Sequence, residues 1–74
     1  MNFKVAIYHQ ILEPKYMRMY YYLEEMDRRK FISSTARKAH LQDVVEVLVD
    51  IIAIKEKYGI DYTDDLELLE KYKK

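Results

Sequence analysis

The 74-residue sequence contains no cysteine, so neither a disulfide bond nor a zinc–thiolate site can stabilise it. With one glycine and one proline, it favours long helices and short connections. No run of about 18 uncharged apolar residues occurs, so we expect neither a membrane-spanning segment nor a membrane partner. Lys4, His9 and Gln10 interrupt the first twelve residues, which argues against a signal peptide. Together with the missing cysteine, this predicts a cytoplasmic protein.

Half of the residues are apolar, which is typical of a folded chain and not of a disordered one. We expect residues 1–74 to form a single helical interaction domain. The core of so small a domain is marginal and is often supplemented by oligomerisation. Residues 1–40 hold eight Lys/Arg and four Asp/Glu (8 − 4 = +4), whereas residues 41–74 hold five and nine (5 − 9 = −4). This charge polarity could drive self-association or give the molecule two faces with different partners.

The most apolar part of the sequence is residues 41–58. Wound as a helix, it carries two adjacent apolar stripes. They consist of Leu41, Val44, Val45, Leu48 and Ile52, and of Val47, Ile51, Ile54 and Tyr58. A helix that is apolar over more than half its circumference must be covered on several sides. The pattern therefore predicts an all-α, three- to four-helix domain with one long, broadly apolar central helix, completed by a protein partner or a second copy as a homodimer.

Local signals divide the chain into helices. Residues 2–9 fit either a strand or a helix, and a helix is favoured because a lone strand has nothing to pair with. Pro14 suits the first turn of a second helix, which extends to residue 31. Ser33 or Ser34 is the expected N-cap of a third helix, which runs to Tyr58 with Gly59 as its C′ residue. Thr63 is the expected cap of a last helix, whose first turn contains Asp64 and Asp65.

Tyrosine supplies eight of the ten aromatic residues. Tyr20, Tyr21 and Tyr22 are consecutive, so one packed helix face cannot hold all three. Tyrosine combines apolar area with a polar tip and is enriched at interfaces. The alternative is that these side chains, with Tyr16, pack at the rim of the core with their hydroxyls in water.

A basic cluster occupies residues 28–40, which contain no acidic residue. Hydroxyls and guanidinium groups around a helix N-terminus make a plausible phosphate site. The candidate phosphate- or DNA-binding residues are Arg28, Arg29, Lys30, Ser34, Thr35, Arg37 and Lys38. The alternative interpretation is a capped turn that simply faces water.

The order of a possible strand, a helix, a short turn and a helix resembles the ribbon-helix-helix repressors. The matching positions are residues 2–8 for the strand and Ser33–Thr35 for the phosphate-contacting turn. The resemblance implies a dimeric DNA-binding regulator in which paired strands enter the major groove. The first helix is too long for this family, and the turn lacks the usual glycine.

An acidic face is predicted on the third and fourth helices. Its candidate partner-binding residues are Asp43, Glu46, Asp50, Asp64, Asp65 and Glu67. Carboxylates on rigid helices can imitate a phosphate backbone and enter a basic groove built for nucleic acid. The alternative is an ordinary solvated helix face.

Residues 65–69, DLELL, resemble the short peptide by which bacterial replication proteins bind the sliding clamp, with Leu66 and Leu69 at the pocket positions. Leucines at this spacing also commonly bury a helix. The composition and compact helical plan resemble small host-takeover proteins of phages that infect Gram-positive bacteria. This resemblance implies an inhibitor of a host replication or nucleic-acid-processing protein, such as the sliding clamp, acting in the host cytoplasm.

Signatures of catalysis are poor. Three carboxylates at residues 24–27, taken with Asp43, Glu46 and Asp50, only half meet the spacing of all-α nucleotide pyrophosphohydrolases, which bind Mg²⁺. His40 and Asp43 are one turn apart, which alone is not a metal site. No phosphate-binding glycine loop or nucleophile motif occurs. We therefore expect neither enzymatic activity nor a cofactor.

Overall fold

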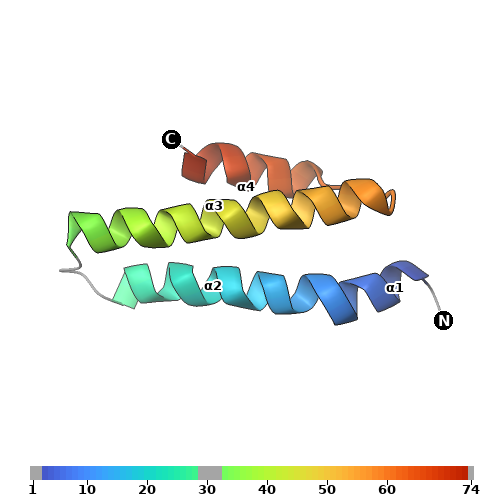
Figure 1. Cartoon of the computed structure of the whole chain (residues 1–74), viewed down its shortest axis with the longest axis horizontal. Helices are drawn as coiled ribbons and strands as arrows, with labels where there is room; N and C mark the ends of the chain where they lie inside the picture. The colour runs from blue at the N-terminus through green and yellow to red at the C-terminus, as the bar shows by residue number, and fades with distance from the viewer. Residues whose placement is uncertain (1–2, 29–32, 74) are drawn as a thin grey trace.

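The computed structural model describes residues 3–28 and 33–73, and every element in this part of the chain is helical (Figure 1). The elements are α1 (Phe3–Ile7), the π-helical turn η1 (Tyr8–Leu12), α2 (Glu13–Arg28), α3 (Ser34–Lys57) and α4 (Thr63–Lys73). The all-α prediction is confirmed. Residues 3–12 are helical and not extended, so the strand that the ribbon-helix-helix resemblance requires is not present there.

The first three elements follow one another without a break and form a single rod, Phe3–Arg28 (Figure 1). The prediction of a separate helix starting at Pro14 is therefore wrong. Proline has no N–H, and in a regular α-helix its ring collides with the carbonyl four residues back. The wider turn η1 lies directly before Pro14, and the Glu13 N–H donates to the carbonyl of Tyr8, five residues back. Because of this π-type turn, the helix continues through Pro14 without ending.

Both ends of α3 have the chemistry that the sequence predicts. The Ser33 hydroxyl accepts a hydrogen bond from the Ala36 N–H at 3.2 Å, which confirms the N-cap. At the other end Tyr58 is the C-cap and Gly59 adopts a φ of 68°. The Ile60 N–H donates to the carbonyl of Lys55 at 2.8 Å, and the Gly59 N–H to that of Glu56 at 3.3 Å. These two bonds form a Schellman motif, so Gly59 is the C′ residue as predicted.

The start of α4 differs from the prediction by a short distance. Thr63 is the first helical residue and not the cap. Asp61 takes the capping role, because its Oδ1 accepts from the Thr63 N–H at 3.1 Å and from the Thr63 hydroxyl at 2.7 Å. These bonds hold the pKa of Asp61 below its usual range.

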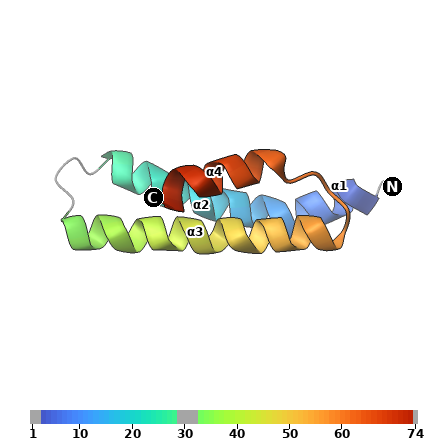
Figure 2. The ribbon, with the colours of Figure 1, turned by 90° about the horizontal axis from the view of Figure 1, so that it is seen from above.

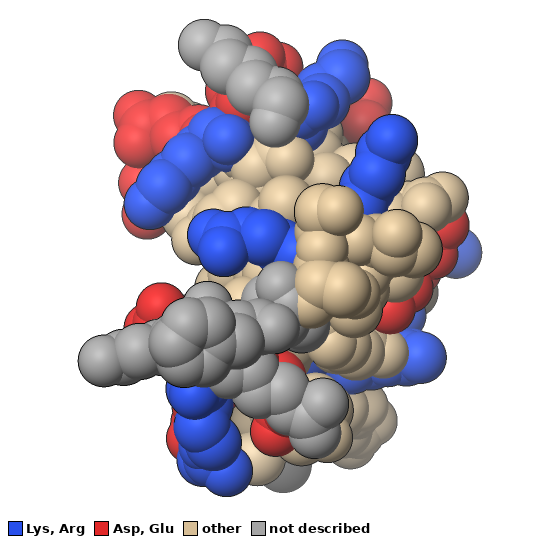
Figure 3. All heavy atoms as spheres, turned by 90° about the vertical axis from the view of Figure 1, so that its left-hand side faces the viewer, with Lys and Arg blue, Asp and Glu red and all other residues tan. Residues whose placement is uncertain are grey.

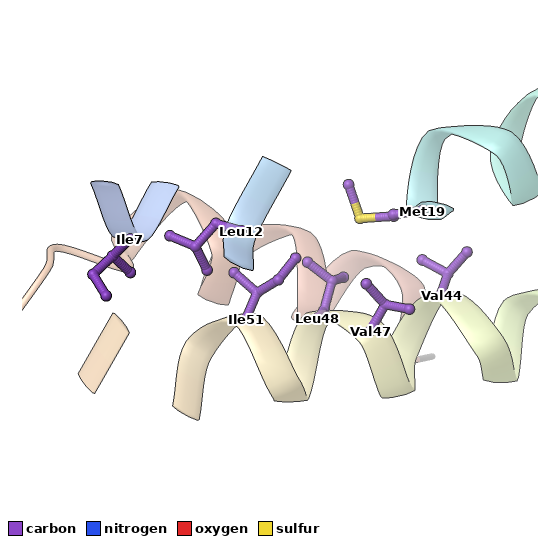
Figure 4. Close-up of a cluster of buried hydrophobic side chains, with 7 residues drawn as sticks. All are labelled: Ile7, Leu12, Met19, Val44, Val47, Leu48 and Ile51. Carbon is purple, nitrogen blue, oxygen red and sulfur yellow. The ribbon is translucent and has the colours of Figure 1, made fainter. Parts of the chain in front are cut away.

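In the described structure, α3 runs back along the rod, and α4 folds back over α3 (Figures 1 and 2). The molecule measures 45 × 21 × 14 Å along its principal axes. Residues on the rod face residues on α3 across a narrow core (Figure 4). The buried members are Ile7, Leu12, Met19, Val44, Val47, Leu48 and Ile51. Helix α4 adds side chains that are only partly buried, among them Leu68, Leu69 and Tyr72.

The expectation of one broadly apolar central helix is not supported. Helix α3 has 24 residues, but only four of them are buried: Val44, Val47, Leu48 and Ile51. In the first predicted stripe Val44 is buried, whereas Leu41 remains half-buried. Among residues 3–28 and 33–73, no helix has the length and apolar character needed to cross a membrane.

Candidate functional site

Three tyrosines form a row along one side of the rod. The ring centroids of Tyr8 and Tyr16 are 6.2 Å apart, and those of Tyr16 and Tyr20 are 6.3 Å apart. Both separations lie within the range of favourable aromatic pairs. Tyr16 is half-buried, whereas Tyr8 is 43% exposed and Tyr20 is 58% exposed. The row therefore presents a pre-ordered aromatic surface to solvent.

This row forms one wall of a hollow of about 280 Å³ between the rod and α4, which we name the tyrosine groove. Its lining residues are Tyr8, Tyr16, Tyr20, Lys55, Asp64, Asp65 and Leu68. A neighbouring hollow of about 300 Å³ shares Tyr8 and Lys55 with it and continues past Val5 and Ile60. The two hollows give the molecule an elongated recess with a mainly apolar and aromatic lining, as is common in binding sites.

Exposed apolar side chains are concentrated on the rod. Among the described residues, eight large hydrophobic side chains are exposed, and six of them belong to the rod: Phe3, Val5, Tyr8, Met17, Tyr20 and Tyr21. Single exposed apolar residues are normal on a protein surface, but a concentration of them marks an interaction site. The rod is therefore the part of the described surface best suited to contact another macromolecule.

The floor of the tyrosine groove is a charged cluster contributed by three helices. Asp65 is only 2% exposed, and its Oδ2 accepts a hydrogen bond from Lys55 Nζ at 2.6 Å. The Tyr16 hydroxyl donates to the other oxygen, Oδ1, at 2.5 Å. Lys55 Nζ also lies 5.3 Å from the centroid of the Tyr16 ring, which is cation–π distance. The carboxylate is thus satisfied on both oxygens, as a buried charge requires.

Two pKa values reflect this arrangement. Burial, followed by the hydrogen bond to Asp65, raises the pKa of Tyr16 to about 12. Burial lowers the pKa of Lys55, but the hydrogen bonds with Asp65 and Tyr16 outweigh it, so the pKa ends above its ordinary value. Lys55 therefore stays charged and Tyr16 stays neutral at neutral pH, and both serve as donors to Asp65.

The structure corrects the placement of Asp65. The sequence pattern predicts that it lies on an exposed acidic face, but its carboxylate is buried and paired. It lies on the inner side of α4, where Lys55 and Tyr16 reach it. The same turn of the helix leaves Asp64 and Glu67 exposed, as an acidic surface requires.

Leu66 and Leu69, the predicted clamp-peptide pair, have different surroundings. Leu66 is 42% exposed, whereas Leu69 is partly buried and packs against the core. In the folded chain Leu69 is therefore held in the helical layer, and only Leu66 is presented to solvent. The two leucines do not form a free pair of side chains for a pocket on a partner.

The carboxylates of α3 lie on a different part of the surface from those of α4. Asp43, Glu46 and Asp50 line a small hollow of about 80 Å³ between α2 and α3, which also contains Arg18. Lys15 Nζ is 3.8 Å from an oxygen of Asp50. A hydrogen bond to Tyr22, with a smaller contribution from Asp43 and Asp50, raises the pKa of Arg18. Arg18 and Lys15 of α2 thus offset part of the negative potential of these three carboxylates.

The candidate basic site is only partly described. Arg28 forms an ion pair with Glu24 at 2.7 Å, and Arg29 and Lys30 lie outside the described residues. Ser34, Thr35, Arg37 and Lys38 are all exposed. Within residues 3–28 and 33–73, neither Arg37 nor Lys38 has a carboxylate partner. Figure 3 views this end of the molecule and shows several Lys and Arg side chains projecting from it.

No metal site is present in the described part of the chain, where no group of three or more His, Asp or Glu side chains could hold an ion. His9 Nδ1 contacts Glu13 at 2.8 Å on the surface. His40 is half-buried, and its Nδ1 has no hydrogen-bond partner among the described residues, while its ring lies 5.7 Å from that of Tyr22. The paired-carboxylate arrangement of the pyrophosphohydrolases is therefore not assembled here.

Comparisons of the chain with known protein families, with curated proteins and with solved structures gave no match. Sequence reasoning singled out tyrosine as an interface residue, but it did not identify the groove. The groove brings together residues 8, 16, 20, 55, 64, 65 and 68, which only the folding of α4 over α3 places side by side.

Proposed function

We propose that this protein acts by binding another protein, and that the tyrosine groove with the neighbouring apolar surface of the rod is its binding site. The observation that carries the proposal is the concentration of exposed apolar side chains on the rod beside a recess lined by ordered tyrosines. Tyrosine rings provide a large contact area at a low cost in conformational entropy, and they are favoured at the centres of interfaces.

The chemistry of the groove suits recognition and not catalysis. Its buried charges, Lys55 and Asp65, already satisfy one another, so neither is poised to exchange a proton with a substrate. The hydroxyls of Tyr8 and Tyr20 and the carboxylate of Asp64 remain available at its edge. An apolar segment that carries a donor group would match this lining. We accordingly propose a binding protein without enzymatic activity.

The test compares capture of protein partners from a Gram-positive bacterial lysate by the wild type and by two variants. Tyr20→Ser with Met17→Ser changes two exposed residues of the rod, and Val49→Ser is a matched change on α3. We expect the rod variant to lose the partner identified by mass spectrometry while the α3 variant retains it. Equal capture by all three proteins would reject the rod as the binding surface.

We further propose that the partner is a host nucleic-acid-processing protein, such as the replication sliding clamp, and that the protein is a phage-type inhibitor acting in the cytoplasm. The exposed carboxylates Glu46, Asp50, Asp64 and Glu67 support a contact with a basic surface. Such charges chiefly accelerate association and fix orientation. Replacing Glu46 and Asp50 by lysine should slow association with the captured partner. An unchanged association rate would leave the tyrosine groove as the site but reject DNA mimicry by α3.

Binding of nucleic acid is the second candidate function. The observation in its favour is the pair of exposed cations Arg37 and Lys38 beside the capped start of α3, which have no carboxylate partner among the residues that the structure describes. A mobility shift with random duplex DNA across a salt series tests it, with Arg37→Glu plus Lys38→Glu compared with Lys57→Glu. A DNA-binding protein should show steep salt dependence that the double variant reduces. Absence of a shift at low salt would exclude this function.

A further inference from the structure

A separate hollow of about 360 Å³ lies where α4 ends against the first half of α3, and we name it the α3–α4 groove. It is lined by Lys38, Leu41, Gln42, Val45, Tyr72 and Lys73. Within the described residues, α4 ends short of the start of α3, so it covers only part of this stretch of α3 (Figures 1 and 2). Leu41, Val45 and Tyr72 are each half-buried at its base.

The rim of the α3–α4 groove is positively charged. Lys38 and Lys73 are exposed, and they come from the two different helices that border the hollow. Ion pairs with them would be solvent-exposed and therefore weak individually, but they can determine which segment enters and in which direction. An apolar side chain flanked by carboxylates would therefore be complementary to this groove in shape and charge.

The same chain presents such a segment on the outer side of α4. Leu66 is 42% exposed, and Glu67 and Glu70 beside it are also exposed. Leu66 and Glu70 are four residues apart, so they are neighbours on the helix surface. We name Leu66, Glu67 and Glu70 the leucine face. It combines the exposed apolar side chain of α4 with two negative charges.

We propose that two copies of the protein associate by placing the leucine face of one copy in the α3–α4 groove of the other. Leu66 would meet Leu41 and Val45, while Glu67 and Glu70 would approach Lys38 and Lys73. Because every copy carries both elements, the contact can be reciprocal and close into a dimer. Burial of Leu66 against the groove supplies the attraction, and the charges fix the relative orientation of the two copies. This inference is independent of the tyrosine groove and its proposed function.

Sedimentation equilibrium with two complementary variants tests the contact. One variant is Lys38→Glu with Lys73→Glu, and the other is Glu67→Lys with Glu70→Lys. We expect the wild type to show a concentration-dependent mass above that of a monomer, and each variant alone to dissociate at least about tenfold more readily. An equimolar mixture of the two should recover association, because each altered groove then faces a leucine face of opposite charge.

Three results would overturn the proposal. They are a monomeric wild type at millimolar concentration, undiminished association of the separate variants, and loss of association on Tyr20→Ser with no effect of the charge reversals. Circular dichroism verifies that each variant is folded. Should a charge-reversed variant fail to fold, Leu66→Ser gives the decision, since it must weaken association whereas Val49→Ser must not.

Discussion

Lys55 Nζ lies 2.6 Å from Asp65 Oδ2, and the two side chains are only 13% and 3% exposed. The pair joins the last turns of α3 to the first turn of α4, ten residues further along the chain. Tyr16 adds the rod to this contact through its hydrogen bond to the same carboxylate. One buried aspartate therefore connects all three helical layers and holds the side of the tyrosine groove that α4 provides.

Removing Asp65 should strongly destabilise the protein. In Asp65→Ala, Lys55, whose side chain is only 13% exposed, would lose its counter-charge, and breaking a buried ion pair in this way typically costs about 3–5 kcal/mol. Urea unfolding measures the change in the free energy of unfolding. Asp64→Ala is the matched control, because Asp64 is exposed and its interaction with the helix dipole contributes less than about 1 kcal/mol. Similar losses for the two variants would show that the Lys55–Asp65 pair does not hold α4.

Stability should decline at alkaline pH through Tyr16. The pKa of Tyr16 is raised from 10.0 to about 12, chiefly by burial and then by the hydrogen bond to Asp65. As the pH rises from 10 to 12, the unfolded chain loses this proton while the folded chain retains it. The contribution is therefore fully present below pH 10 and is lost as the pH approaches 12.

Unfolding experiments on the wild type and on Tyr16→Phe across this alkaline range measure the effect. We expect the wild type to lose stability more steeply, because the variant lacks the titrating hydroxyl. Tyr16 is only partly buried, so solvent screening keeps the difference modest. Parallel pH dependences in the two proteins would contradict the assignment.

Leu48→Ala should remove much of the stability of the domain. Leu48 is fully buried at the centre of the core, where truncation to alanine costs about 2–5 kcal/mol. Val49→Ala, at the next position of the same helix, is the control, because Val49 is 49% exposed and its truncation should change stability by less than about 0.5 kcal/mol. A shift of the urea midpoint that is equally small in both variants would exclude Leu48 from the core.

Gly59→Ala should destabilise through the backbone alone. Gly59 has a φ of 68°, and a Cβ atom placed on it would meet nothing within 4 Å. The expected loss is therefore about 1–2 kcal/mol, the cost of a left-handed conformation for a residue with a side chain. Gly59→Asn should lose less, because asparagine tolerates this conformation. Thermal unfolding of the two variants gives the order, and an alanine variant as stable as the wild type would be inconsistent with this cap.

Local signals in the sequence predicted the ends of α3 well. Ser33 and Gly59 act through bonds to residues within five positions, so their roles depend on the neighbouring sequence alone. Pro14 was interpreted less well. Its missing N–H predicts a helix start, but it does not reveal that a π-type turn can absorb the proline within a continuous rod. In the continuous rod, Ile7 and Leu12 are both buried in the core.

The sequence by itself determined that the chain is helical, where α3 begins and ends, and that tyrosine and charge dominate its surfaces, because these properties follow from periodicity, capping chemistry and composition. Only the tertiary structure decided which side chains share a site. Asp65 and Leu69 turn inward because α4 folds back over α3, whereas Asp64 and Leu66 on the same helix stay exposed. The tyrosine groove and the α3–α4 groove arise in the same way, since each is bordered by residues far apart in the sequence that meet only through helix packing.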